Sequence, residues 1–595
     1  MWVFSFFVSI SCVLLAVAVS AASGKLGGEK KHKIGLLQAL LVGSVAAACV
    51  LFFPVHVATE DSSAIGSWQV LLLSILDSME VLKGGCSLDS IKGGMPGCPD
   101  WLDVAYQLWA ATLFVIAPVL TLGFILSFFR NLSASLRYRM AFFADVYAFS
   151  ELNEKSLALA TDIKKNSKKA CVIFAGTKQG NETVEELKEA AEKLGAIFFH
   201  RNIVAINLAR HSAKAPLYLF AIADDETENL NQALRLVEKY HDRAETHLYA
   251  LTTKMESELL LTAVDKGAVK VRRVNEVRSL IDRILFEQGN ILFDGARLTD
   301  AGTKRISAVV VGMGRHGTEM VKSLAWYCQM DGYELRVNAF DKDPLARDRF
   351  TLLAPELMSP DYNGVQVPGE AAYRIDIHSG MDVNSVAFAD TVSRITDATY
   401  ILVALGKDDL NISTAVNLRM YFERLKIHPV IQAIVYDSQR KKALEGIQNY
   451  RGQAYDIQFI GDMEASYTEA VIMGSELEAQ ALQRHLKWGK EEEFWTYEYN
   501  YRSSVASAIH MKARIHCGIA GADKKEDELT GREQEIIENL EHRRWNAYMR
   551  SEGYVFSGST DKSSRNDLAK MHHDLVDFSS LTEEEKRKDS KVGTP

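Results

Sequence analysis

The feature of this 595-residue chain that most constrains its fold is an abrupt change of composition near residue 130. Three long apolar segments precede that point, and the rest of the chain alternates between short apolar runs and charged, amphipathic stretches. A helix needs roughly 20 consecutive apolar residues to cross the hydrocarbon core of a bilayer. The segments 1–22, 34–58 and 106–129 meet that requirement without one Lys, Arg, Asp or Glu. The sequence therefore predicts a transmembrane domain over 1–130 with three spanning helices.

Basic residues beside the apolar segments predict the topology, because Lys and Arg are retained preferentially in the cytoplasm. Such residues follow the first and third segments: Lys25, Lys30, Lys31, Lys33, Arg130, Arg137 and Arg139. We therefore expect the N-terminus outside and everything after residue 130 in the cytoplasm. A cleaved signal peptide is the alternative for the first segment, since small residues lie near its end, although no basic residue precedes it.

The predicted outer loop, residues 59–105, contains Cys86 and Cys98. An oxidising compartment would permit a disulfide between them, and two unpaired thiols are the alternative. The other five cysteines show no CxxC or histidine spacing, so no zinc site is expected. A net charge of -9 gives no reason to expect nucleic acid as a partner, since binding to its phosphates needs a basic face.

Within this loop, the apolar stretch 66–82 is too short to cross a bilayer. One interpretation is a re-entrant segment of a cation pore, in which Asp77 and Glu80 supply a ring of carboxylates. The other is a helix that lies on the outer surface of the membrane. The chain contains no TVGYG-like potassium filter.

A dinucleotide-binding pattern begins at the apolar run 306–311, which is typical of a buried parallel strand. A GxGxxG turn, a helical stretch and a second strand ending in an acid follow. The residues of this pattern are Gly312, Gly314, Arg315, Gly317 and Asp341. The glycines allow a tight turn, close approach of a pyrophosphate and close helix–strand packing, and the acid accepts hydrogen bonds from ribose hydroxyls. The alternative is that the glycines serve packing alone and that the arginine is merely solvated.

Further strands and helices alternate as far as residue 475, which predicts a parallel α/β domain over 305–475. The segment 140–300 reads as a degenerate copy of the same unit. Its Ala223–Asn231 stretch mirrors Gly406–Asn411, since each follows an apolar strand and precedes a helix. However, Ser150-Glu151-Leu152-Asn153 stands in the place of the glycine turn, so this copy is not expected to cradle a dinucleotide in the usual way.

The GMGRHG turn, the strand ending at Asp341 and the stretch ALGKDDLN together resemble the regulator-of-potassium-conductance domain, also called the Trk-type NAD-binding domain, over about 140–475. The resemblance implies two tandem Rossmann-like, doubly wound lobes per subunit in a tetrameric cytoplasmic gating ring. It also implies that the three glycines and Asp341 contact NAD, ATP or another nucleotide, with Asp408 and Asp409 near the cleft.

The region 490–595 resembles the ryanodine-receptor repeat, a small, mainly helical module found in bacterial proteins. The matching positions are Glu541-His542, Trp545, Gly553-Tyr554, His572, Leu575-Val576 and Asp589. We expect a small polar ligand to bind among Glu541, His542, Arg544, Trp545 and His572, with the tryptophan stacking on a ring. The alternative is that these side chains form part of a packed core.

Taken together, these patterns predict a ligand-gated conductance or transport regulator in a bacterial plasma (inner) membrane. It would be a homo-oligomer in contact with membrane lipid. Its ligand would be a nucleotide, for which NAD, ATP and a cyclic nucleotide are the candidates. A second hypothesis is a nucleotide-sensing membrane effector of a bacterial stress or antiphage response. A third, an NAD-dependent oxidoreductase, is disfavoured because no Ser-His-Asp or Tyr-x-x-x-Lys constellation lies beside the second lobe, so no enzymatic activity is expected.

Overall fold

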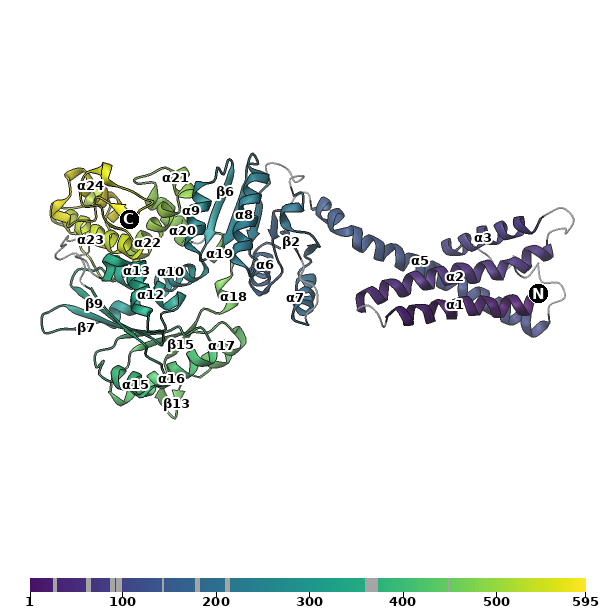
Figure 1. Ribbon diagram of the computed structural model, residues 1–595, viewed down its shortest axis with the longest axis horizontal. Coiled ribbons are helices and arrows are strands. Elements are labelled where there is room, and N and C mark those ends of the chain that lie inside the picture. The colour runs from purple at the N-terminus through teal and green to yellow at the C-terminus, as the bar shows by residue number, and fades with distance from the viewer. Residues whose placement is uncertain are drawn as a thin grey trace. The chain divides into compact units, whose positions relative to one another are not determined.

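The computed structural model describes residues 1–24, 29–59, 66–85, 91, 99–141, 144–176, 182–208, 215–358, 373–447, 449–474 and 476–594. The chain forms two compact units, residues 1–140 and residues 141–595, which we call unit 1 and unit 2 (Figure 1). Each is described by itself.

Unit 1 is helical. Its main helices are α1 (Trp2–Gly24), α2 (Glu29–Thr59), α3 (Ser67–Lys83) and α5 (Asp100–Met140). Two stretches are long and apolar enough to cross a membrane by length and composition, Ala39–Ala58 in α2 and Asp100–Leu122 in α5. The apolar stretch found in α1, Trp2–Ala18, is shorter. The structure therefore supports two candidate spans, and the third stays a prediction.

The predicted re-entrant segment is one continuous helix, α3, which packs against α2 and α5. The two predicted pore carboxylates have cationic or titratable partners within unit 1. Asp77 Oδ2 lies 2.8 Å from His56 Nε2 on α2, and Glu80 Oε1 lies 2.9 Å from Lys83 Nζ. The predicted disulfide residues, Cys86 and Cys98, lie outside the described residues.

The first part of unit 2 is a parallel sheet in the order β3-β2-β1-β4-β5-β6. Its strands are β1 (Val146–Phe149), β2 (Cys171–Ala175), β3 (Ile197–Phe199), β4 (Leu217–Ala221), β5 (Thr246–Leu251) and β6 (Val269–Val274). The helices between them are α6 (Glu154–Asn166), α7 (Glu182–Lys193), α8 (Glu226–Tyr240) and α9 (Met255–Ala263). β1 and β2 are buried along their whole length, as their apolar sequences predict.

Helices α10 (Glu276–Gln288) and α11 (Asn290–Asp294) lead to a second sheet in the order β10-β9-β8-β11-β12-β15, with a short β7 (Arg297–Leu298) antiparallel to β8. Its parallel strands are β8 (Lys304–Val311), β9 (Tyr333–Asp341), β10 (Tyr373–Ser379), β11 (Tyr400–Val403), β12 (Val430–Ile434) and β15 (Ile457–Ile460). Its helices are α12 (Arg315–Tyr327), α13 (Ala346–Leu353), α14 (Pro355–Met358), α15 (Val386–Val392), α16 (Asp408–Arg424) and α17 (Ser438–Glu445), and β13 (Asn449–Tyr450) and β14 (Gln453–Ala454) form a hairpin.

Register in the second sheet places the end of β8 between the ends of two neighbouring strands. Val311 pairs with Phe340 of β9 on one side and with Val403 of β11 on the other. The strand order reverses at this point, because β9 follows β8 on one side of the sheet and β11 lies on the other. In open α/β sheets, ligands bind in the crevice at such a switch point.

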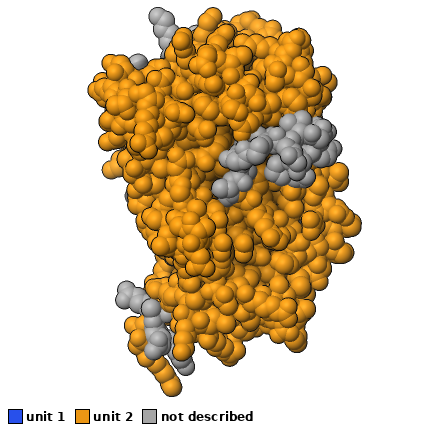
Figure 2. Space-filling model, turned by 90° about the vertical axis from the view of Figure 1, so that its left-hand side faces the viewer, with its two compact units in different colours: residues 1–140 blue, residues 141–595 orange. Residues whose placement is uncertain are grey.

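The C-terminal part of unit 2 is mainly helical. It contains α18 (Met463–Ser466), α19 (Glu469–Ile472), α20 (Glu476–His485), α21 (Glu491–Thr496), α22 (Glu498–His516), α23 (Gly531–Ser551) and α24 (Glu583–Gly593), with a short parallel pair, β16 (Val555–Phe556) and β17 (Met571–His572). Figure 2 shows the face of unit 2 on the left of Figure 1, where α23 and α24 lie. One hydrophobic core includes buried residues of α10, β8, α12, α22 and α23, so the C-terminal helices share a core with the second sheet.

Candidate functional site

The glycine turn lies between β8 and α12, and its three glycines meet different neighbours. Gly312 has a φ of +98°, and a Cβ there would lie 2.4 Å from the carbonyl oxygen of Ala404. A Cβ on Gly317 would lie 1.7 Å from the carbonyl oxygen of Gly312. A Cβ on Gly314 would meet no atom within 4 Å. The first and third glycines are therefore required by the turn itself, and the second leaves backbone open to a ligand.

Asp341, the acid at the end of β9, holds this turn from the side. Its Oδ2 accepts a hydrogen bond of 2.6 Å from the backbone N–H of Met313, and its Oδ1 accepts one of 2.8 Å from the N–H of Asp343. A carboxylate offers about four lone-pair sites, so these two bonds leave capacity for a ligand hydroxyl.

A cavity of about 590 Å³, which we call the glycine-turn cavity, opens beside Gly314 and Asp341. Three parts of unit 2 line it. Thr253, Glu258, Arg273 and Arg278 come from the first sheet and the helices that follow its strands; Glu319, Lys322 and Arg349 come from the second; Arg502, Glu552 and Lys570 come from the C-terminal part. Seven Lys or Arg and five Asp or Glu face this space, which gives its lining an excess of positive charge.

Buried ion pairs form one wall of the glycine-turn cavity. Glu319 Oε1 lies 2.8 Å from Arg278 Nε, and Glu552 Oε1 lies 3.0 Å from Arg278 Nη2. Lys322 Nζ is 3.4 Å from both carboxylates, and Glu552 also pairs with Arg502. Burial alone would raise the pKa of Glu319, but the charges of Arg278 and Lys322 hold it at about 2. The Glu319 carboxylate is thus ionised throughout the neutral range.

Arg315 and His316, in the second half of the glycine turn, contact other loops. Arg315 Nη1 lies 3.2 Å from Glu226 Oε1 at the start of α8, so the turn of the second sheet is bridged to the first sheet's helix. Burial lowers the pKa of His316, whose Nε2 lies 3.1 Å from the hydroxyl of Tyr436. Arg315 is largely exposed and lines the cavity, so its guanidinium can turn to a phosphate there.

Asp408 and Asp409, which the sequence predicts as ligand-binding residues, are not among the residues that line the glycine-turn cavity. Asp408 accepts hydrogen bonds of 3.0 to 3.1 Å from the backbone N–H groups of Tyr436 and Asp437. Asp409 is exposed and lies 2.6 Å from Arg440 Nη1. Their observed contacts hold the loop after β12 against the start of α16.

The mirrored stretches, Ala223–Asn231 and Gly406–Asn411, share one structural feature: an asparagine that forms hydrogen bonds to the ends of two neighbouring strands. Asn229 Oδ1 accepts from the N–H of Ala223, and its Nδ2 donates to the carbonyl of Leu251. Asn411 makes the matching bonds, from the N–H of Leu405 and to the carbonyl of Ile434. Each asparagine therefore links the strand before it to the next strand along the chain.

In the first sheet, the turn after β1 is closed by its own side chains. Ser150 Oγ accepts from the N–H of Ile222 at 2.8 Å, and Asn153 Nδ2 donates to the carbonyl of Ile222 at 2.8 Å. Asn153 also caps α6 by accepting from the N–H of Ser156. These bonds tie the turn after β1 to the end of β4.

A second cavity, of about 660 Å³, lies in the C-terminal part, and we call it the C-terminal cavity. It brings together all five residues predicted to bind a ligand there: Glu541, His542, Arg544, Trp545 and His572. Glu541 and Arg544 are almost fully buried, with 2.7 Å between Oε1 and Nη2, and Arg514 also pairs with Glu541. Burial would raise the pKa of Glu541, but these arginines hold it well below its usual range. Nη1 of Arg544 is buried and has no hydrogen-bond partner among the described residues.

The aromatic residues of the C-terminal cavity pack against one another. The ring of Trp545 lies edge-on to that of His572, with 4.9 Å between centroids. His542 Nε2 lies 2.9 Å from the carbonyl oxygen of Val576, and its Nδ1 lies 3.3 Å from Asp589. These contacts account for much of the clustering, so the five residues build the wall of a cavity as well as part of a core.

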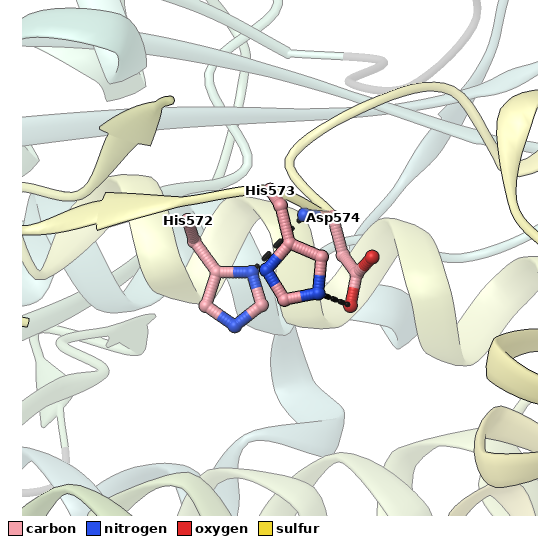
Figure 3. Close-up of side chains that lie close together, drawn as sticks. All are labelled: His572, His573 and Asp574. Carbon is pink, nitrogen blue, oxygen red and sulfur yellow. Dashed lines mark hydrogen bonds and ion pairs between the residues drawn. The ribbon is translucent and has the colours of Figure 1, made fainter. Parts of the chain in front are cut away.

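Among the residues described, one group has the composition of a metal site: His572, His573 and Asp574, with ligand atoms within 4.8 Å of one another (Figure 3). The two imidazoles are stacked, with 4.7 Å between centroids and an interplanar angle of 10°. Their in-plane lone pairs therefore lie in nearly parallel planes, and Nδ1 of His572 already accepts from the N–H of Asp574. A tetrahedral zinc centre needs ligands that converge on one point. This arrangement does not fit one.

Comparisons with protein-family models and with curated proteins find no match for this chain. The functional conclusion therefore depends on the geometry of the two cavities.

Alanine at Gly317 and at Gly314 gives a matched pair of tests for the turn. Gly317→Ala forces a Cβ into the carbonyl of Gly312, so we expect a loss of about 2 kcal/mol or more in the free energy of unfolding. Gly314→Ala meets open space and keeps a φ of −68°, so its stability stays near that of the wild type. Urea unfolding of the full-length protein in detergent measures both. Equal stabilities would contradict the assigned geometry.

The stability of the C-terminal part depends on pH through His572. Burial lowers its pKa from 6.5 to about 3, so between these values the unfolded chain binds a proton that the folded chain does not. Stability from this group is therefore lost as pH falls from 6.5 towards 3, by up to about 1.4 kcal/mol per pH unit. His572→Asn keeps an acceptor for Asp574 and removes the titration, so its stability relative to wild type rises on acidification. Urea unfolding of both proteins at pH 7, 6 and 5 measures this difference. If wild type and His572→Asn lose the same stability between pH 7 and pH 5, the burial of a neutral His572 is contradicted.

Proposed function

We propose that this protein is a ligand-gated membrane conductance in which a nucleotide-type ligand binds a cytoplasmic pair of Rossmann-like lobes. The ligand shifts the arrangement of these lobes and thereby acts on the membrane helices. No chemical step is required. The single observation that carries the proposal is the glycine-turn cavity, where open backbone at Gly314 meets a lining rich in positive charge.

Several features of this cavity suit a phosphorylated ligand. Its volume of about 590 Å³ is within the range of small-molecule sites, roughly 300 to 1,000 Å³. The N-terminus of α12 begins at Arg315, directly after Gly314, and the free N–H groups of a helix start favour phosphate. Asp341 is placed beside the turn and keeps lone pairs for a ribose hydroxyl. NAD, ATP and cyclic nucleotides are the ligand candidates.

The strand order supports the interpretation of unit 2 as two tandem lobes. Both sheets have the order 3-2-1-4-5-6 when their strands are numbered within each sheet, which is the order of dinucleotide-binding folds. Asn229 and Asn411 make matching hydrogen bonds between neighbouring strand ends, which is a further similarity between the two lobes. The turn closed by Ser150 and Asn153 favours the second lobe, not the first, as the lobe that binds the ligand.

A direct connection through the chain favours mechanical coupling. Helix α5 contains a candidate span and ends at Met140, and β1 of the first sheet begins at Val146. A displacement of unit 2 therefore reaches a membrane helix through a short segment. Coupling between a ligand site and a gate is typically worth about 1 to 3 kcal/mol, and assembly of several subunits multiplies that energy. With α1 as a third span, everything after α5 lies in the cytoplasm of a bacterial cell.

One observation favours a second candidate, a membrane effector of a stress or antiphage response that responds to a signalling nucleotide. The carboxylates proposed to line a pore, Asp77 and Glu80, are paired with His56 and Lys83 of the same chain. Such pairing leaves less free negative charge for a selective ring of carboxylates. In this alternative the ligand makes the helices breach the membrane without ion selectivity.

Recording from purified full-length protein in planar bilayers separates these functions. We expect current only when NAD, ATP or a cyclic nucleotide is added, and we expect Gly314→Val to abolish the response because its side chain would fill the space beside the turn. Trp545→Ala, in the C-terminal cavity, preserves the response if the glycine turn is the receptor. Ion-selective current indicates a channel, and nonselective leakage indicates the effector. A membrane that stays silent with ligand bound would contradict both.

A further inference from the structure

Lys570 is a residue of the C-terminal part that reaches the glycine-turn cavity. It has a φ of +52°, a left-handed conformation that costs a residue with a side chain about 1 kcal/mol or more. The neighbouring chain holds it there, since its carbonyl accepts from the N–H of Val555 at 2.9 Å.

A close approach of two segments fixes this position. Gly553 has a φ of +83°, and a Cβ there would lie 2.7 Å from the carbonyl oxygen of Leu353, at the end of α13, and 3.7 Å from Lys570 Cδ. The C-terminal part thus touches the second sheet's helix through a glycine, and the stem of Lys570 runs beside that contact.

The ammonium group of Lys570 has only part of its bonding capacity used. Its Nζ donates to the carbonyl oxygen of Glu552 at 2.7 Å, and an ammonium has three donors. The other cations of the cavity have carboxylates: Arg278 and Lys322 pair with Glu319, Arg273 and Arg502 with Glu498, Arg315 with Glu226, and Arg349 with Asp343. Within the described part of the chain, Lys570 forms no ion pair with a carboxylate.

Burial disfavours the charged form of this ammonium. It lowers the pKa of Lys570 from 10.5 to about 8; Glu258 opposes that effect, and the nearby cations Lys322, Arg278 and Arg273 add to it. An anion from outside the chain that contacts the ammonium would offset the cost of burying its charge.

We propose that Lys570 binds a phosphoryl group of the ligand in the glycine-turn cavity, so that the C-terminal part supplies one side of the nucleotide site. This inference rests on the proposed function and deepens it. A ligand held by the glycine turn and by Lys570 joins the second sheet to the C-terminal part, and Arg273 and Arg278 of the same cavity extend the contact to the first sheet.

The structural alternative is that Lys570 only caps α23, because Glu552 is the C-cap residue directly after that helix and its carbonyl is the acceptor. Capping affects the stability of the protein without ligand, whereas phosphate binding affects affinity and its dependence on pH. The test therefore measures both.

Calorimetric titration of the full-length protein in detergent with ATP, ADP, NAD and pyrophosphate provides that test. We expect Lys570→Met to weaken binding of the phosphorylated ligand about 10- to 100-fold, the effect of losing one charge-assisted contact. Lys586→Met removes an equal charge from α24, where Lys586 lies 2.9 Å from Glu583, and serves as the control with unchanged affinity.

The pH dependence adds a second readout. The phosphodiester groups of NAD do not titrate between pH 7 and 9, so with this probe a fall in wild-type affinity over that range is the result expected from loss of charge on the lysine. Lys570→Arg keeps its charge and is expected to bind at both pH values with similar affinity. If Lys570→Met does not fold, this comparison decides the matter, and equal slopes for wild type and Lys570→Arg would overturn the inference.

The remaining outcomes separate this inference from the proposed function. Binding that is abolished by Gly314→Val but unchanged by Lys570→Met would overturn the role of Lys570 and leave the proposed function intact. Reduced stability of Lys570→Met with unchanged affinity would identify a helix cap only. A wild-type protein that binds none of the four probes and no cyclic nucleotide would contradict the proposed function, and this inference with it.

Discussion

The carboxylate of Glu552 is the group on which the rest of unit 2 depends. It lies at the end of α23 and pairs with Arg278 of α10, Lys322 of α12 and Arg502 of α22. Three cations converge on one half-buried acid, and each comes from a different helix. Removing one partner of a buried pair leaves an uncompensated charge and is strongly destabilising, by about 3 to 5 kcal/mol. The cavity wall is therefore fixed by pairing that no single part of the chain supplies.

This arrangement is the reason that we propose the glycine-turn cavity as the ligand-binding site. Its walls belong to both sheets and to the C-terminal helices, which meet at the same ion pairs. An anionic ligand that joins this network changes the balance of charge for all three parts at once. Under the proposed function, binding at such a site would change the arrangement of the three parts. The chain continues directly from α5, which contains a candidate span, into unit 2.

Much of the fold follows from local patterns. Apolar runs predict strands of both sheets, among them β1, β2 and β8, because buried parallel strands need continuous apolar sequence. β6 and β10 gave no such signal, since Val269–Val274 and Tyr373–Ser379 alternate apolar with charged or polar residues at the edges of their sheets. β5, Thr246–Leu251, begins with the polar residues Thr246 and His247, so its apolar run is interrupted at the start.

Some residues of the candidate site could also be predicted from the sequence, and others could not. The glycine turn and Asp341 could be recognised because their residues follow one another along one strand–turn–helix–strand unit. Asp408 and Asp409 lie in the first turn of α16, and the sequence pattern alone could not show that this turn does not line the cavity. Glu552 and Lys570 carry no local signal at all, because Arg278 and its partner Glu552 are 274 residues apart and meet only in the folded chain.

Hydrogen–deuterium exchange of the full-length protein, with and without saturating nucleotide, tests the central claim most directly. The account predicts slower exchange in three separate segments together: the glycine turn and the start of α12, the β6–α10 connection, and residues 552–570. Protection confined to the C-terminal cavity around Trp545, or absent from the glycine turn, would contradict it.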